Sequence, residues 1–464
     1  MIKNTRIKGI ILVLAFVFLM SSVAFAAPVH KDLLPEVSPD NIYNHIAALV
    51  FADEENPNGI DNARVTGFEG EYRAADYIAK QFQKYGLEVE RQEFPVLSYV
   101  SNGVELKMVS PEEREFTTRN FDFTPDTTEF EGGELTAEIV HVGLGYVSDY
   151  EGKDVEGKIA LISRGDFTFF EKAENAAAAG AVGAIIYNNA TNELDMIMGT
   201  LGSPTDIPVV AMCKKDGLEL AELLKDEIVV MTIKNDTSIA DSYSQNIIAT
   251  LKATGNNKKA QTIIIGAHYD SVDCPGANDN ASGTATMLEI ARVLSKEKLA
   301  YNIKFIAFGA EEVGLNGSYE YVESLTDEEL DDILAMINMD MVGVGNGIGV
   351  MTATNRESFV ADLAEVYIQE FDFQYERSIS TASDHAPFDY VGIPVVFLNY
   401  GPDPYYHTDE DSLDKISKEN LYNMGSLVTT MTYDLAKAPS KKVEKELKSK
   451  VPKSELRNTE IPEE

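Results

Sequence analysis

Histidine and acidic side chains stand at or soon after the ends of four apolar segments of this sequence. Those segments are "QTIIIGA", "NIKFIAFGA", "DILAMINM" and "IPVVFLNY". The side chains that follow them are, in chain order, His268, Asp270, Glu311, Glu312, Asp340 and His407, and the loop "DCPGANDNASG" adds Asp279. Because open α/β sheets bind ligands at the carboxyl ends of their strands, parallel neighbouring strands would bring these side chains to one edge.

These residue types form the donor set of a two-zinc site. Zinc binds imidazole nitrogen and carboxylate oxygen at about 2.0–2.2 Å. Two metal ions about 3.5–4 Å apart, bridged by a carboxylate, can hold a water molecule between them. That water needs a base that is not itself a metal ligand. The adjacent pair Glu311 and Glu312 can divide these two roles if the glycine-rich turn "GAEEVGLNGS" separates their side chains.

Each of these residues also has an ordinary structural interpretation. An aspartate at a strand end commonly forms a turn or caps a helix, and Asp270 and Asp279 could each do so. The glutamate pair could be a solvated turn, since the chain carries 76 acidic residues. Asp340 fits such an interpretation less well, because an unpaired carboxylate after an apolar strand would be costly to bury. The coincidence at four strand ends favours a metal site.

The composition is that of a soluble globular protein: 464 residues, 44% hydrophobic and 25% charged. A formal net charge of −37 repels phosphate backbones, so we expect no nucleic acid partner. Cys213 and Cys274 are too few for a disulfide framework or a cysteine-rich metal site. We expect them to be free, buried thiols, although an exported protein could pair them.

The first 26 residues have the pattern of a secretory signal peptide. Basic residues precede the apolar run "IILVLAFVFLM", and an A-x-A pattern ends at Ala26. We therefore expect cleavage after Ala26 and a secreted, extracellular mature protein. That run is short for a membrane span and no later stretch reaches about 18 apolar residues, so we expect no membrane span.

Apolar strands that alternate with helical patterns from Asn246 onward predict an α/β fold with a mixed, mostly parallel sheet flanked by helices. A middle region with short strands and many glycines and alanines reads as a separate, inserted β-rich α+β domain. The expected regions are a signal peptide at 1–26, an N-terminal part of the main domain at 27–115, the inserted domain at 116–238, the main part at 239–437, and a charged, disordered tail at 438–464.

The motifs "AHYDSV", "GANDNASG", "GAEEVGLNGS", "NMDMVG", "SDHAPF" and "YYHT" resemble, in order and spacing, those of the M28 family of metallopeptidases, the di-zinc aminopeptidases. The middle region, which includes "EGKIALISRG" and "IPVVAMCKKDG", resembles a protease-associated (PA) domain. The whole arrangement resembles secreted bacterial leucyl/arginyl aminopeptidases. The resemblance implies two Zn²⁺ per chain and peptide substrates with a free N-terminus.

Carried over to this sequence, the resemblance implies that His268 and Asp340 hold one zinc, that Glu312 and His407 hold the other, and that Asp279 bridges them. It also implies a cis peptide bond directly after the bridging aspartate.

Further roles follow from the same resemblance. Glu311 would be the general base, and Asp270 would orient the nearby imidazole. Tyr406 would polarise the scissile carbonyl, or it is a plain loop residue. The residues implied near the substrate pocket are Ser383, Asp384 and Phe388.

Several alternatives stay open at this point. A carboxypeptidase of the same family would need arginines for the terminal carboxylate, and Arg292, Arg356 and Arg377 are the nearest in sequence. A one-zinc glutaminyl cyclase or a non-catalytic metal-binding protein is less consistent with the complete ligand set and the glutamate base. The preferred first residue (Leu, Arg, Lys or a broad range) is open. The basic tail could make a weak contact with the cell wall or be simply solvated.

Overall fold

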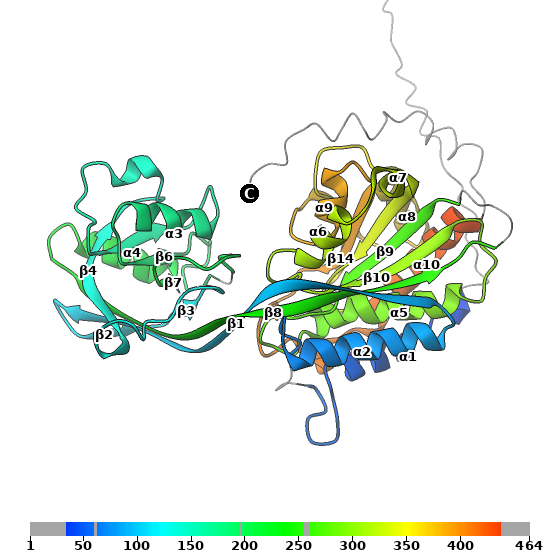
Figure 1. Cartoon of the computed structure of the whole chain (residues 1–464), viewed down its shortest axis with the longest axis horizontal. Helices are drawn as coiled ribbons and strands as arrows, with labels where there is room; N and C mark the ends of the chain where they lie inside the picture. Colours follow the sequence, from blue (N-terminus) through cyan, green and yellow to red (C-terminus); the bar gives the residue numbers. More distant parts are fainter. Residues whose placement is uncertain (1–33, 60–62, 195, 198, 255–259, 438–464) are drawn as a thin grey trace, which may run out of the picture.

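The computed structural model describes residues 34–59, 63–194, 196–197, 199–254 and 260–437. The expected signal peptide and the expected C-terminal tail lie outside these residues. The chain forms two lobes, a large main lobe and a smaller inserted lobe, joined by a long two-stranded ribbon (Figure 1).

The helices are α1 (Pro39–Leu49), α2 (Glu69–Lys84), α3 (Phe169–Ala178), α4 (Lys214–Leu223), α5 (Gly283–Leu294), α6 (Asn316–Glu323), α7 (Asp327–Asp332), α8 (Phe359–Glu370), α9 (His385–Tyr390) and α10 (Lys418–Lys437). The strands are β1 (Glu88–Ser110), β2 (Arg114–Phe116), β3 (Arg119–Asn120), β4 (Leu135–His141), β5 (Ile159–Ser163), β6 (Gly183–Tyr187), β7 (Val209–Met212), β8 (Val230–Leu251), β9 (Thr262–His268), β10 (Asn302–Phe308), β11 (Ile333–Met339), β12 (Gly347–Thr352), β13 (Tyr375–Ile379) and β14 (Val395–Gly401).

The main lobe is built on a mixed sheet with the strand order β13-β12-β14-β11-β9-β10-β8-β1. Its central strands β14, β11, β9 and β10 run parallel, whereas β8 pairs antiparallel with β10 and β12 pairs antiparallel with β14. The α/β architecture expected from the sequence, with a mixed and mostly parallel sheet between helices, is confirmed.

Helices cover both faces of this sheet. Ile263 and Ile265 of β9 face the core formed with α1, α2, α5, α8 and α10, while Ile264 between them faces the core formed with α6, α7 and α9. This alternation explains why the strands read as continuous apolar runs, since both sides of each strand are buried.

The register of the parallel strands aligns their carboxyl ends. His268, the last residue of β9, lies opposite Phe308, the last residue of β10. Met339 at the end of β11 pairs with Leu398 in β14. The residues that follow these strands therefore meet at one edge of the sheet.

The inserted lobe comprises β2–β7, α3 and α4 and extends from the ribbon of β1 and β8 (Figure 1). Strands β4, β5, β6 and β7 run parallel, and β4 joins the lobe to β8. The expected boundaries at 115/116 and 238/239 lie inside β2 and β8, so the two lobes share continuous strands.

Two expectations about single features can be compared with the structure directly. Cys213 and Cys274 are both buried and free, as predicted. In the part of the chain that the structure describes, no helix combines the length and the apolarity that a membrane crossing requires.

Candidate metal centre

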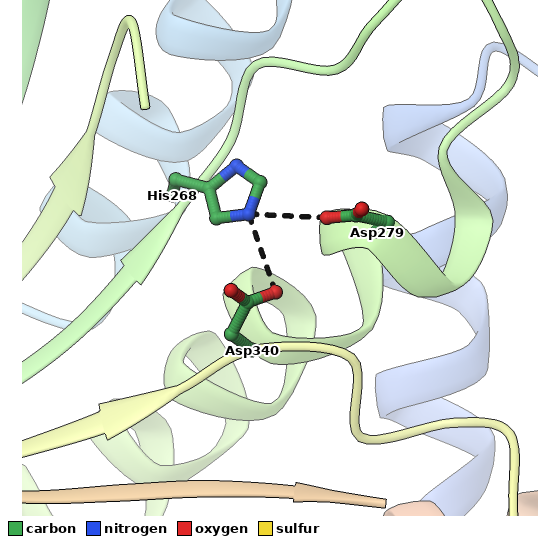
Figure 2. Close-up of side chains that lie close together, drawn as sticks. All are labelled: His268, Asp279 and Asp340. Atoms are coloured by element: carbon green, nitrogen blue, oxygen red, sulfur yellow. Dashed lines mark hydrogen bonds and ion pairs between the residues drawn. The ribbon is translucent and has the colours of Figure 1, made fainter. Parts of the chain in front are cut away.

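Three of the expected ligands form a compact buried cluster at the edge of the sheet. The Nε2 atom of His268 lies 3.2 Å from Oδ1 of Asp279 and 3.2 Å from Oδ1 of Asp340 (Figure 2). His268 comes from the end of β9, Asp340 follows β11, and Asp279 lies in the irregular turn Ala277–Ser282 that leads into α5. All three are almost fully buried.

The other expected ligands form a second cluster around the same aspartate. Nε2 of His407 lies 3.2 Å from Oδ2 of Asp279 and 3.1 Å from Oε2 of Glu312. Asp279 thus directs one carboxylate oxygen to each imidazole. The two clusters meet at this side chain, which is the arrangement that a bridging carboxylate requires.

The turn that follows β10 separates the side chains of Glu311 and Glu312. Ala310 before them has a φ of +55°, a left-handed conformation that turns the chain sharply at the end of the strand. The two backbone N–H groups of the pair donate to the two carboxylate oxygens of Asp270, each at 3.2 Å. Asp270 therefore fixes the backbone of the turn that carries both glutamates.

The carboxylates of Glu311 and Glu312 are held differently. Oε1 of Glu312 accepts a hydrogen bond from Val272 N at 3.2 Å, so its other oxygen faces His407. The Glu311 carboxylate has no hydrogen-bond partner among the described residues, and it lies with His268 and Glu312 in a third close group. Burial raises the pKa of Glu311 well above its usual range, and the Glu312 and Asp340 carboxylates add to this rise.

The charges of the centre call for bound cations. Burial lowers the pKa of His407, but the carboxylates of Glu312 and Asp279 raise it to about 11. The buried Nε2 of His407 nevertheless makes no hydrogen bond within the described residues. Nitrogen and oxygen atoms bound to one tetrahedral zinc at about 2.0–2.1 Å lie about 3.3 Å apart, close to the separations found here. The donor set, the excess of carboxylates and these separations therefore fit divalent zinc.

Several residues that support the centre were not found from the sequence. The buried guanidinium of Arg64 donates to the carbonyl oxygens of Tyr269, Pro275 and Gly276, at 2.7, 2.6 and 2.8 Å. It links the segment before α2 to the loop between His268 and Asp279. The only signal in the sequence was a basic residue in "NARVTGFEG", which carries no chemistry by itself.

Asp411 and Asn280 stabilise the same loop by further hydrogen bonds. The Asp411 carboxylate accepts hydrogen bonds from the backbone N–H groups of Asn278 and Asp279, at 2.7 and 3.0 Å. Asn280 donates to Met339 O at 3.0 Å, next to Asp340. The peptide bond between Asp279 and Asn280 is cis, as the resemblance implied.

The remaining predicted site residues occupy different places. Ser383 is fully buried behind Asp340 and donates from Oγ to its Oδ2 at 2.8 Å. Asp384 is buried, and its carboxylate oxygens have no hydrogen-bond partner among the described residues. Burial raises the pKa of Asp384 to about 7, an effect that His268 opposes.

Phe388 and Tyr406 lie in opposite environments. Phe388 is buried in the core between the sheet and helices α6, α7 and α9, where its ring centroid lies 6.0 Å from that of Phe308, so the structure does not bring it to the metal centre. A phenylalanine suits this position because the position faces an apolar core. Tyr406 is 45% exposed, and its ring stacks on His407 with centroids 3.8 Å apart. The structure thus places this ring beside an expected ligand.

A mixed α/β sheet with two such clusters at the carboxyl ends of its parallel strands defines a metal-dependent hydrolase. Comparison with known families makes this specific. The model of peptidase family M28 matches residues 246–432, and that of the PA domain matches residues 134–220.

Known proteins show the same relationship over most of the chain. Aminopeptidase YwaD of Bacillus subtilis (strain 168) is 37% identical over 401 residues, which cover 83% of this chain and 85% of that protein. The structure of an aminopeptidase from Aneurinibacillus sp. strain AM-1 is 37% identical with a TM-score of 0.78, covering 88% of this chain and 96% of the other. That of BSAP, a zinc aminopeptidase from Bacillus subtilis, is 36% identical with a TM-score of 0.68, covering 86% and 96%. The chain therefore belongs to peptidase family M28 and contains a PA domain.

Proposed function

We propose that this chain is a secreted two-zinc aminopeptidase that removes N-terminal residues from peptides. The observation that carries the proposal is the position of Asp279, whose two carboxylate oxygens face the imidazoles of His268 and His407 at 3.2 Å each. The aminopeptidase and zinc aminopeptidase similar to this chain support the same reading. The signal-peptide pattern at 1–26 supports secretion.

The ligand sets divide around the shared aspartate. His268 and Asp340 would hold one ion, Glu312 and His407 the other, and Asp279 both. When bound, the zinc ions would supply Lewis acidity that lowers the pKa of water and polarises the scissile carbonyl. Ser383 holds the second oxygen of Asp340 and so fixes the direction in which that ligand points.

Glu311 has the features of the general base. Its carboxylate is not held by a hydrogen bond from a described residue, while the turn that carries it is fixed through Asp270. A carboxylate that is not itself a metal ligand can accept a proton from the attacking water and then give it to the leaving amine. Glu312, engaged by Val272 N and His407, is left to the metal.

The acidic character of the site also suits the amino end of a peptide. A protonated α-amine would be attracted by carboxylates that are not metal ligands, and Glu311 is such a group. Asp384 adds a further carboxylate close to Glu311. Tyr406, whose ring stacks on His407, would donate its hydroxyl to the oxygen of the scissile carbonyl.

A carboxypeptidase would need an arginine to bind the terminal carboxylate of its substrate, and the three arginines nearest to the motifs in sequence are paired with acidic side chains. Arg292 is engaged by Glu289, Arg356 by Asp389, and Arg377 by Asp362 and Glu365. Arg64 lies near the metal centre, but its guanidinium already donates hydrogen bonds to three backbone carbonyl oxygens.

Mass spectrometry of a short peptide tests the proposal. Purified mature protein is incubated with Leu-Gly-Gly-Phe in the presence of zinc, with a chelator, and with an N-acetylated copy of the peptide. We expect stepwise loss of residues from the amino end that the chelator and the acetyl group both abolish. Loss of Phe from the carboxyl end, or trimming that survives the acetyl group, would contradict the proposal.

A further inference from the structure

A cavity next to the metal centre is built by both lobes. It has a volume of about 270 Å³ and is bordered by Glu312 and Val313 on the side of the metal centre. The main lobe also contributes the segment before α2 and the loop after β9, with Val65, Phe68 and Val272 among its apolar residues. Tyr99 to Ser101 of β1 and Asp122 of the inserted lobe form the opposite wall.

Asp122 contributes a carboxylate to this wall. Its backbone is tied to the inserted lobe, since Asp122 N donates to Gly199 O and Asp122 O accepts from Leu201 N. Its half-buried side chain makes no hydrogen bond or ion pair with a described residue. Burial raises the pKa of Asp122 to about 6, and Asp273, which also lines the cavity, adds to this rise while His407 opposes it.

The hydroxyl group of Tyr99 on the same wall is also unpaired among the described residues. Tyr99 is 9% exposed, and its buried hydroxyl has no hydrogen-bond partner among the described residues. None of the described residues that line the cavity is lysine, arginine or histidine. The cavity thus combines apolar sides with the carboxylates of Asp122 and Asp273 and has no basic side chain among its described lining residues, which is the environment that suits an aliphatic stem with a cationic tip.

We propose, building on the aminopeptidase function above, that this cavity receives the side chain of the substrate's first residue and that Asp122 selects lysine or arginine there. The cavity is bordered by Glu312, beside the atoms that would hold the scissile bond, and the inserted lobe forms its opposite wall. The side chain of a first residue can enter a cavity of about 270 Å³ from that side, whereas the rest of the peptide must continue into solvent. The inserted lobe would then be part of the specificity site.

The test compares wild type with Asp122→Asn on Lys-Ala-Ala-Phe, Leu-Ala-Ala-Phe and Ala-Lys-Ala-Phe. We expect the substitution to lower kcat/KM for the lysine-first peptide about tenfold relative to the leucine-first peptide, since one ionic contact in a partly buried site is lost. The leucine-first rate should fall far less than the lysine-first rate, and thermal unfolding of the variant checks its folding. Asp226→Asn, which removes an exposed charge after α4 away from the cavity, should leave the ratio unchanged.

Asp122→Glu provides a second variant that keeps the charge, and it should retain the preference for lysine. An unchanged ratio of lysine-first to leucine-first cleavage in Asp122→Asn would overturn the inference. So would an effect confined to Ala-Lys-Ala-Phe, because the cavity would then hold the second residue. If wild type trims none of the peptides, the proposed aminopeptidase function itself fails, which is a different outcome.

Discussion

Replacing Arg64 with methionine should weaken both the fold around the metal centre and the affinity for zinc. Methionine retains an unbranched stem but removes the three donors that reach Tyr269 O, Pro275 O and Gly276 O. Each buried carbonyl left without a donor costs about 1–3 kcal/mol. Because the loop can relax in part, we expect a total loss of about 3–5 kcal/mol rather than the full sum.

The affinity of the metal centre for zinc should also fall in this variant. The three carbonyls belong to the loop between His268 and Asp279, so loosening that loop shifts two ligands relative to each other. Residues that orient metal ligands typically change affinity about 10–100-fold when removed. We therefore expect zinc affinity to fall by such a factor.

Urea unfolding of the chelated protein, together with zinc titration against a chromophoric chelator, measures both effects. The matched control is Arg91→Met, since Arg91 is 37% exposed and contacts Asp76 at 2.6 Å on the surface. Its loss should cost less than about 1 kcal/mol. If Arg64→Met behaves like this control in both measurements, the reasoning about the buried guanidinium is refuted.

Three further substitutions test single parts of the centre. Glu311→Gln should lower kcat by about 10³-fold or more with zinc still bound, because it removes the base and no ligand. Metal analysis and peptide turnover check this, and retained activity would exclude the assignment of Glu311 as the base. Asp279→Asn should weaken binding of both ions together, which a zinc titration shows; loss of one ion alone would argue against a shared ligand. Ser383→Ala should reduce zinc affinity about 10–100-fold by freeing Asp340, whereas an unchanged affinity would make Ser383 a packing residue only.

The sheet and its chemistry could be predicted from the sequence because both follow local patterns. Continuous apolar strands indicate a sheet covered on both faces, and β9 with its neighbours shows this arrangement. Once the strands are parallel, residues after their ends must meet, as His268 and Asp340 do. No long-range information beyond the order of the strands is needed for this step.

The supports of the centre could not be predicted in the same way. Arg64 and Asp411 act on backbone groups more than 130 residues away in the chain. Hydrogen bonds to a backbone carry no signature in the sequence of the partner. For Phe388, the motif predicted a place near the substrate pocket. Its ring instead points from the helix into the core, which the motif alone does not indicate.

The cavity between the lobes depends on tertiary structure entirely. Asp122 is one of 76 acidic residues, and its sequence context gives no reason to select it. The long ribbon of β1 and β8 and the packing of Val313 on the core of the inserted lobe let Asp122 border the same space as Glu312.

The most direct test of the central claim is anomalous X-ray scattering at the zinc edge from crystals of the zinc-loaded protein. The account predicts two zinc peaks about 3.5–4 Å apart, one on each side of the Asp279 carboxylate. One should lie at His268 and Asp340, the other at Glu312 and His407. A single peak, or two peaks that do not share Asp279, would contradict it.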